Sequence, residues 1–256
     1  MAVRNLLLIL SLLLLSACGS SPDENDPTAG LSVEELYALA QEALSDGNYD
    51  TAIEHFERLE SRFPYGPYAV RAQLEIIYAY YKYGEKETAI LSADRFIKLH
   101  PNHTHVDYAY YMRGLSSFRL EPSLLDRWFN QDMTERDPRP ARESFRYFSE
   151  LVRKFPNSRY AEDAVARMYA LRDSLAKHEL HVARYYLKRG ALLAAANRAK
   201  YLVENYQKTS EVPEALGIMV RAYRKLGLND LADDALKVLE LNYPDNAETR
   251  RAKAAS

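Results

Sequence analysis

GNYDTAIEHFERLESRFP, residues 47–64, is the stretch of sequence that decides the fold, because its spacing returns twice along the chain. GEKETAILSADRFIKLHP (84–101) and GLNDLADDALKVLELNYP (227–244) also place an alanine five residues after the glycine and a proline twelve residues after that alanine. Positions four and seven after each alanine are apolar, so the three residues share one face of a helix. Proline ends this helix because it cannot donate the i→i−4 hydrogen bond. The three copies therefore predict a repeated helix.

Two further copies carry the same helix spacing after longer intervals. They contain Ser144, Phe148, Leu151 and Pro156, and then Ala195, Ala199 and Leu202 with Gln207 in place of proline. The copy that ends at Pro156 contains extra residues around 117–140. This region holds three prolines and predicts a long loop. The excess of the second falls between Asn157 and Arg189, where no glycine or proline occurs, and predicts a lengthened helix.

These spacings resemble the tetratricopeptide repeat (TPR). In that repeat helix A ends at a turn glycine, a small residue lets helices A and B approach closely, and proline ends helix B. We expect an all-α, TPR-type helical repeat solenoid of about five helix pairs. An ordinary helical bundle is the alternative, and the recurrence of the spacings disfavours it.

The first eighteen residues, MAVRNLLLILSLLLLSAC, are typical of a secretory signal. The leucine-rich stretch after Arg4 is too short to span a membrane. Leu15-Ser16-Ala17-Cys18 resembles the bacterial lipobox, in which the cysteine is acylated and becomes the new N-terminus. An ordinary signal peptide with an accidental cysteine is the alternative. Gly19 follows the cysteine where inner-membrane lipoproteins usually carry aspartate, so the resemblance implies the outer membrane.

The chain therefore divides into five parts. We predict a lipoprotein signal peptide over 1–17 and a lipidated Cys18 followed by a flexible tether to residue 30, since 19–30 hold no bulky apolar side chain. N-terminal repeats over 31–122 and C-terminal repeats over 141–250 follow, separated by an inserted loop over 123–140.

The composition of the 256 residues excludes several classes of protein. Lys and Arg number 34 against 36 Asp and Glu, which leaves a net charge of −2 and argues against a nucleic-acid partner. A single cysteine excludes an internal disulfide and a cysteine-based metal centre. Charged residues at 27% and a mean hydropathy of −0.41 exclude a polytopic membrane protein.

Aromatic side chains gather on helix A of the first three repeats. The positions that line the concave face of a TPR array hold Tyr37, Arg71, Tyr78, Tyr81, Tyr108, Tyr111 and Phe118. Tyrosine combines a rigid apolar ring with a polar tip, which suits a partly wet contact, and Arg71 suits a carboxylate. We expect a groove for an extended peptide here. The alternative is that these rings only pack helix A against helix B.

Four longer segments resemble one family, the BamD (ComL) family of outer-membrane protein assembly factors. They are FPYGPYAVRAQLEIIYAYYK (63–82), HVDYAYYMRG (105–114), ERDPRPARESFRYFSELVRKFPNSRYAEDAVARM (135–168) and LAKHELHVARYYLKRGALLAAANRAKYLVENY (175–206). The resemblance implies a scaffold lipoprotein of the β-barrel assembly machinery, anchored in the outer membrane and facing the periplasm.

The same resemblance implies a set of partners. The C-terminal half is expected to bind the POTRA domain of the barrel subunit BamA, near Asn197 and Arg198, and to carry other lipoproteins of the Bam complex. The N-terminal half is expected to receive targeting segments of unfolded outer-membrane proteins. From the residues, we predict that the aromatic groove takes the C-terminal segment of such proteins, with micromolar affinity.

Motifs for catalysis are absent from the sequence. No G-x-x-x-x-G-K-[ST], H-E-x-x-H or G-x-S-x-G occurs, and neither His178 with His181 nor the histidines around Pro101 form a convincing metal site. We expect no enzyme activity, no cofactor and no metal. Two alternatives stay open: a different TPR adaptor lipoprotein of the cell envelope, linked to peptidoglycan, and an enzyme with a site at Asp137 in WFNQDMTERDP (128–138).

Overall fold

The computed structural model describes residues 27–119 and 137–254, and these ranges contain helices and no strand. The pairs are α2 (Val33–Ser45) with α3 (Tyr49–Arg62), α4 (Pro67–Tyr83) with α5 (Lys86–Leu99), α6 (Val106–Ser117) with α8 (Arg139–Lys154), α9 (Ala161–Lys188) with α10 (Leu192–Asn205), and α11 (Val212–Lys225) with α12 (Asn229–Asn242), followed by α13 (Ala247–Ala254). The predicted all-α repeat of five helix pairs is confirmed. Cys18, the signal peptide and most of the tether and inserted loop lie outside the described residues.

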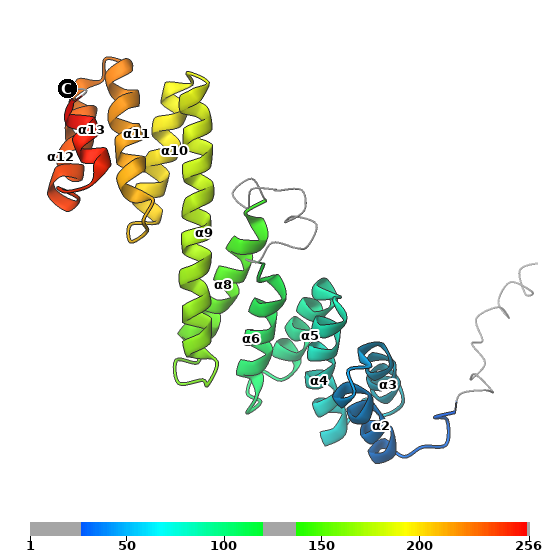
Figure 1. The fold of residues 1–256 in the computed structure, drawn as a ribbon. Coiled ribbons are helices and arrows are strands. Elements are labelled where there is room, and N and C mark those ends of the chain that lie inside the picture. The colour runs from blue at the N-terminus through cyan, green and yellow to red at the C-terminus, as the bar shows by residue number, and fades with distance from the viewer. Residues whose placement is uncertain (1–26, 120–136, 255–256) are drawn as a thin grey trace, which may run out of the picture.

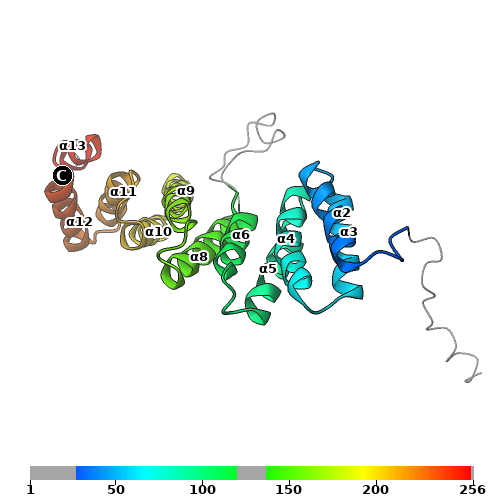
Figure 2. The same cartoon turned by 90° about the horizontal axis from the view of Figure 1, so that it is seen from below.

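The pairs stack into an elongated array with α2 at one end and α13 at the other (Figure 1). In Figure 2, α4, α6, α9 and α11 lie along one side, which we call the A side, and α5, α8, α10 and α12 lie along the other. Each pair packs on its sequence neighbours, as in other solenoids. Stability of one repeat therefore depends mainly on the repeats beside it.

The helix boundaries follow the local signals in the sequence. Each B helix ends two residues before the proline of its repeat, or before Gln207 where proline is replaced. The B helices are α3, α5, α8, α10 and α12. At the turn between α4 and α5, Gly84 has φ of 102°, a left-handed conformation that other residues adopt only with strain, and its N–H donates to the carbonyl of Tyr80.

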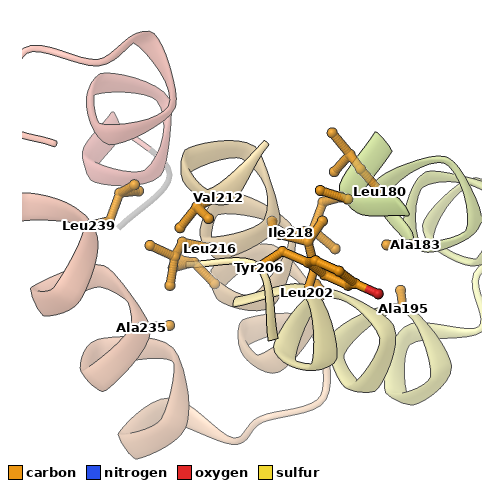
Figure 3. Close-up of a cluster of buried hydrophobic side chains, with 14 of the residues drawn as sticks. Leu180, Ala183, Ala195, Leu202, Tyr206, Val212, Leu216, Ile218, Ala235 and Leu239 are labelled. Carbon is orange, nitrogen blue, oxygen red and sulfur yellow. The ribbon is translucent and has the colours of Figure 1, made fainter. Parts of the chain in front are cut away.

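The repeated positions form the core. Ala52, Phe56 and Leu59 are fully buried, as are their equivalents Ala195, Ala199 and Leu202. Figure 3 shows such a cluster in the last repeats, where Leu180, Leu202, Leu216 and Leu239 converge from α9, α10, α11 and α12. Burial of one leucine or phenylalanine side chain contributes about 1.5 to 3 kcal/mol. The spacing found in the sequence therefore marks the residues that hold helix A to helix B.

Helix α9 spans 28 residues and confirms the predicted lengthening. Its Leu171 is buried in the cluster that includes Phe148 of α8, whereas Leu175 and Leu180 belong to the cluster of the last repeats. One continuous helix of about 42 Å therefore contributes to both hydrophobic cores. It joins the core shared with α6 and α8 to the core of the last two repeats without a turn between them.

Helix α13 follows the fifth helix pair and was not predicted from the sequence. It lies on the A side beside α11 (Figure 2). Arg221 Nη1 donates to Glu248 Oε2 at 2.8 Å, and Arg224 Nη1 donates to the carbonyl of Ala252 at 2.8 Å. A Cβ atom at Gly217 would overlap the Glu248 carboxylate. These residues of α11 therefore bind α13.

Candidate binding surfaces

The predicted aromatic positions separate into two groups in the structure. The first group consists of Tyr37 on α2, Arg71 and Tyr78 on α4, and Tyr108 on α6; we call it the aromatic row. Arg71 is exposed, and the three tyrosines are half-buried. The Tyr37 ring lies 5.3 Å from that of Tyr68, and the Tyr78 ring lies 6.4 Å from that of Tyr49. The row thus runs across three successive A helices.

Charged groups lie among these rings. Burial raises the pKa of Tyr37, the nearby Glu75 carboxylate adds to the rise, and Arg71 opposes it. Burial also raises the pKa of Tyr108, again with a contribution from Glu75. Arg71, Glu75 and Tyr78 are spaced at i, i+4 and i+7 on α4, so they share one face of the helix and Glu75 lies in the middle of the aromatic row. Glu75 is not among the residues predicted from the sequence, since an acidic residue on a helix is usually solvated.

The second group is engaged by neighbouring helices. Tyr111 stacks on Tyr160 with ring centroids 4.8 Å apart, and its hydroxyl donates to Asp163 Oδ2 at 2.7 Å. Burial and that hydrogen bond raise the pKa of Tyr111 to about 12. The guanidinium of Arg167 lies 4.7 Å from the centre of the Phe118 ring. Tyr81 packs against the cores of the first three repeats. Packing between helices, the alternative to a peptide groove, thus describes Tyr81, Tyr111 and Phe118.

The C-terminal candidates lie on α10, as predicted. Asn197 is exposed and borders an open hollow of about 530 Å³, together with Leu193 and Leu226. Arg198 Nη1 donates to Glu179 Oε2 at 2.8 Å, and Arg142 Nη2 donates to the other oxygen of this carboxylate at 2.9 Å. Glu179 is fully buried. Sequence reasoning missed both Glu179 and Arg142, because 19 and 37 residues separate them from their partners.

This three-residue cluster carries surplus positive charge. Two guanidinium groups share one carboxylate, and the side chains of Arg142 and Arg198 remain 45% and 38% exposed. Arginine has five N–H donors in a planar fork, so each guanidinium keeps donors for a second partner. The buried carboxylate fixes the position of both cations, and the surface they form suits an acidic group of another protein.

Comparisons with known proteins identify the family. The family described as "YfiO: Outer membrane lipoprotein" matches residues 30–239. The chain is 48% identical over 246 residues to the outer membrane protein assembly factor BamD of Neisseria gonorrhoeae, which covers 94% of this chain and 92% of the relative. It is 40% identical over 234 residues to BamD of Vibrio cholerae, covering 91% and 96%. The chain belongs to the BamD family.

Members of the BamD family are named as outer-membrane protein assembly factors, so the resemblance found in the sequence is confirmed. Among solved structures, a TPR protein of Thermus thermophilus has 16% identity and a TM-score of 0.36, covering 88% of this chain and 98% of its own. The TPR2AB domain of yeast Sti1 has 13% identity and a TM-score of 0.44, covering 87% and 82%.

An assembly factor on a helical scaffold points to a non-catalytic role. Asp137, the residue kept for an enzyme alternative, is half exposed, and Arg139 donates to both of its oxygens, from the backbone N–H at 3.0 Å and from Nε at 2.7 Å. The backbone hydrogen bond lowers the pKa of Asp137, which disfavours it as a general acid. In residues 27–119 and 137–254, no group of three His, Cys, Asp or Glu side chains is placed to hold a metal ion.

Within residues 27–119 and 137–254, no helix combines the length and the apolar character needed to cross a bilayer.

Proposed function

We propose that the protein is a lipid-anchored periplasmic scaffold of the outer-membrane β-barrel assembly complex. One observation carries the proposal: the chain aligns over 94% of its length, at 48% identity, with an outer membrane protein assembly factor. The lipobox ending at Cys18 supports an anchor in the outer membrane facing the periplasm. The folded repeats then present two separate surfaces, one in each half of the array.

The C-terminal surface is proposed to bind the POTRA region of BamA and to help carry other lipoproteins of the complex. Asn197 offers an exposed amide beside the apolar hollow, and Arg198 offers a guanidinium held in place by buried Glu179. An acidic side chain of the partner would complete the hydrogen bonding of the fork, since charge-assisted bonds are stronger than neutral ones.

Arg198→Gln tests this contact. Loss of the guanidinium donors facing outward should weaken co-purification with BamA about tenfold, the scale of one charge-assisted hydrogen bond. Arg153→Gln is the matched control, because Arg153 is exposed on α8 and makes no ion pair among the described residues. Equal recovery of BamA with wild type and Arg198→Gln would remove Arg198 from the interface. Melting curves separate loss of contact from loss of fold, since Arg198 also neutralises Glu179.

The N-terminal surface is proposed to receive C-terminal segments of unfolded outer-membrane proteins. An extended segment places alternate side chains on one face about 6.6 Å apart. The rings of the aromatic row can contact that apolar face, and exposed Arg71 can hold a terminal carboxylate. Each of these contacts is partly solvated, so the expected affinity is micromolar, which permits release of the segment.

Tyr78→Ala tests the N-terminal surface. Loss of the ring should weaken binding of a barrel-derived C-terminal peptide several-fold, as one aromatic contact is worth about 0.5 to 1.5 kcal/mol. Tyr83→Ala is the control, because Tyr83 lies at the end of the same helix and is more than half exposed. Binding that is equal in all three folded proteins, measured by fluorescence anisotropy, would contradict the proposal. Co-purification of BamA should be unchanged in Tyr78→Ala, since the two surfaces lie in different halves of the array.

A further inference from the structure

Two polar side chains, Gln41 and Glu75, lie beside each other at the aromatic row. Tyr37 and Gln41 lie one turn apart on α2, and Arg71 and Glu75 lie one turn apart on the neighbouring α4. Tyr108 of α6 completes the surroundings of Glu75.

The amide of Gln41 is the first of these side chains. Its Nε2 atom is buried and has no hydrogen-bond partner of good geometry among the described residues. The amide is close enough to Glu75 to lower the pKa of that carboxyl, but the contact falls short of a formed hydrogen bond. A buried donor without an acceptor is costly, and native proteins rarely retain one without a reason.

The carboxyl of Glu75 is the second. It forms no ion pair within residues 27–119 and 137–254, and burial raises its pKa despite the Gln41 amide. The phenols of Tyr37 and Tyr108 are near it. The surface thus holds one donor and one acceptor side by side, both partly withdrawn from water, and the donor has no partner of good geometry within the described residues.

An amide donor beside a carboxylate acceptor matches the main chain of an extended peptide. A strand offers N–H and C=O groups along its edge while its side chains point to the two faces. Its apolar side chains would contact the rings, and its edge would meet Gln41 and Glu75. A free terminal carboxylate would be attracted to Arg71 and repelled from Glu75, so the two charges fix the direction of the strand.

We propose that Gln41 and Glu75 form a main-chain clamp: the Gln41 amide donates to a carbonyl oxygen of an extended peptide, the Glu75 carboxylate accepts one of its N–H groups, and Arg71 holds the terminal carboxylate. The proposal rests on the proposed peptide-binding function of the aromatic row and names how that surface recognises its ligand. Glu75 and Gln41 are thus specificity-determining residues for a backbone, not for a particular side chain.

The test uses a short peptide of alternating apolar and polar residues that ends in phenylalanine, in several forms. One form has a free carboxylate, one has a C-terminal amide, and a series carries a single N-methyl group at each of the last peptide bonds. Binding to the mature protein is measured by fluorescence anisotropy. One N-methyl position should weaken binding about five- to tenfold in wild type, the scale of one hydrogen bond to a charged acceptor.

Variants then locate the lost hydrogen bond. Glu75→Leu removes the acceptor, so the N-methyl penalty should vanish in this variant, whereas Glu75→Gln keeps an acceptor oxygen and should keep most of the penalty. Arg71→Gln should abolish the preference for the free carboxylate over the amide, and Glu75→Leu should leave that preference in place. Glu42→Leu, an exposed position on α2, is the control for added apolar surface. Glu75→Ala, which removes the same acceptor with a smaller side chain, serves if Glu75→Leu does not fold.

The outcomes separate the clamp from the proposed function. A penalty of equal size in wild type and Glu75→Leu would overturn the clamp while leaving peptide binding intact. The clamp would also be overturned if an added lysine raised the affinity of the peptide and Glu75→Leu weakened binding only of the lysine-containing peptide. Glu75 would then recognise a side chain. Failure of wild type to bind any form of the peptide would instead refute the proposed function of the row.

Discussion

At the scale of single residues, two neighbouring residues of α6 illustrate how this array depends on close contacts. Gly114 of α6 faces Phe148 of α8, and the carbonyl of Gly114 accepts a hydrogen bond from buried Ser144 at 2.8 Å. Arg113, its neighbour, is 7% exposed and binds two carboxylates. The first is a steric requirement and the second an electrostatic one, and each leads to a prediction.

Gly114→Ala should destabilise the protein. A Cβ atom at this position would lie 2.6 Å from the ring of Phe148, so the ring or the helix must move. Overpacking of this kind costs about 1 to 3 kcal/mol. Gly30→Ala is the matched control, because a Cβ there meets nothing within 4 Å. Urea denaturation of both variants measures the difference, and equal midpoints would show that α6 and α8 can separate without cost.

Arg113→Met should also destabilise the protein, by about 2 to 3 kcal/mol, because it leaves partly buried carboxylates without a partner. Arg113 donates to Asp94 and to Glu150 at 2.6 Å and lies 4.4 Å from the centre of the Tyr147 ring. Arg153→Met is the control, since Arg153 is exposed.

The effect of Arg113→Met should depend on pH. Burial by itself raises the pKa of Glu150, but hydrogen bonds from Lys154 and Arg113 outweigh it, so the pKa lies below its ordinary value of 4.5. A lowered pKa gives stability that is present above the ordinary value and is lost as pH falls through the lowered one. The difference in unfolding free energy between wild type and Arg113→Met should therefore shrink below about pH 4. A difference that is constant from pH 7 to pH 3 would contradict this account.

At the scale of elements, the two unusual helices are α9 and α13. Helix α9 carries residues of two cores and joins them without a turn. Helix α13 covers the A side of the last repeat, where an open-ended solenoid would expose α11. Terminal helices commonly cap repeat arrays in this way.

Removal of α13 by truncation after Asn246 should loosen the last repeat. Arg221 would lose Glu248, and the surface of Gly217 that Glu248 now covers would be exposed to water. Amide hydrogens of α11 should then exchange faster, whereas those of α4 should not change, because repeats contact only their neighbours. Hydrogen exchange read by mass spectrometry distinguishes these helices. Unchanged protection in α11 would mean that α13 contributes no stability.

At the scale of the whole molecule, the proposed attachment to the membrane depends on one atom, the sulfur of Cys18. Cys18→Ser should move the protein from the outer-membrane fraction to the soluble periplasm, because acyl chains contribute about 0.8 kcal/mol per buried CH₂ and nothing else proposed here inserts into lipid. Fractionation followed by a carbonate wash measures the shift. Retention of the variant in washed membranes would mean that another contact anchors it.

The elongated array keeps the two proposed surfaces apart. The aromatic row lies on α2, α4 and α6, and Asn197 and Arg198 lie on α10, nearer the other end (Figure 1). Contacts in separate repeats are nearly independent, so variants at the two surfaces should have additive effects on binding.

The sequence by itself determined the features that depend on local interactions. Helix ends follow from proline and glycine, whose effects on the backbone act within one turn, and the buried face of each B helix follows from the spacing of Ala52, Phe56 and Leu59 and their equivalents. The length of α9 follows from the absence of any helix breaker between Asn157 and Arg189. These signals repeat, so each copy supports the others.

Only the tertiary structure decided which polar and aromatic side chains are available to a partner. Tyr111 and Tyr108 look alike in the sequence, and both rings contact Tyr160, yet the hydroxyl of Tyr111 is bound by Asp163 from another repeat. Arg198 is fixed by Glu179, and Arg221 and Arg224 are bound by α13. The physical reason is that burial and pairing depend on residues distant in sequence, and no periodic pattern encodes a contact that occurs once.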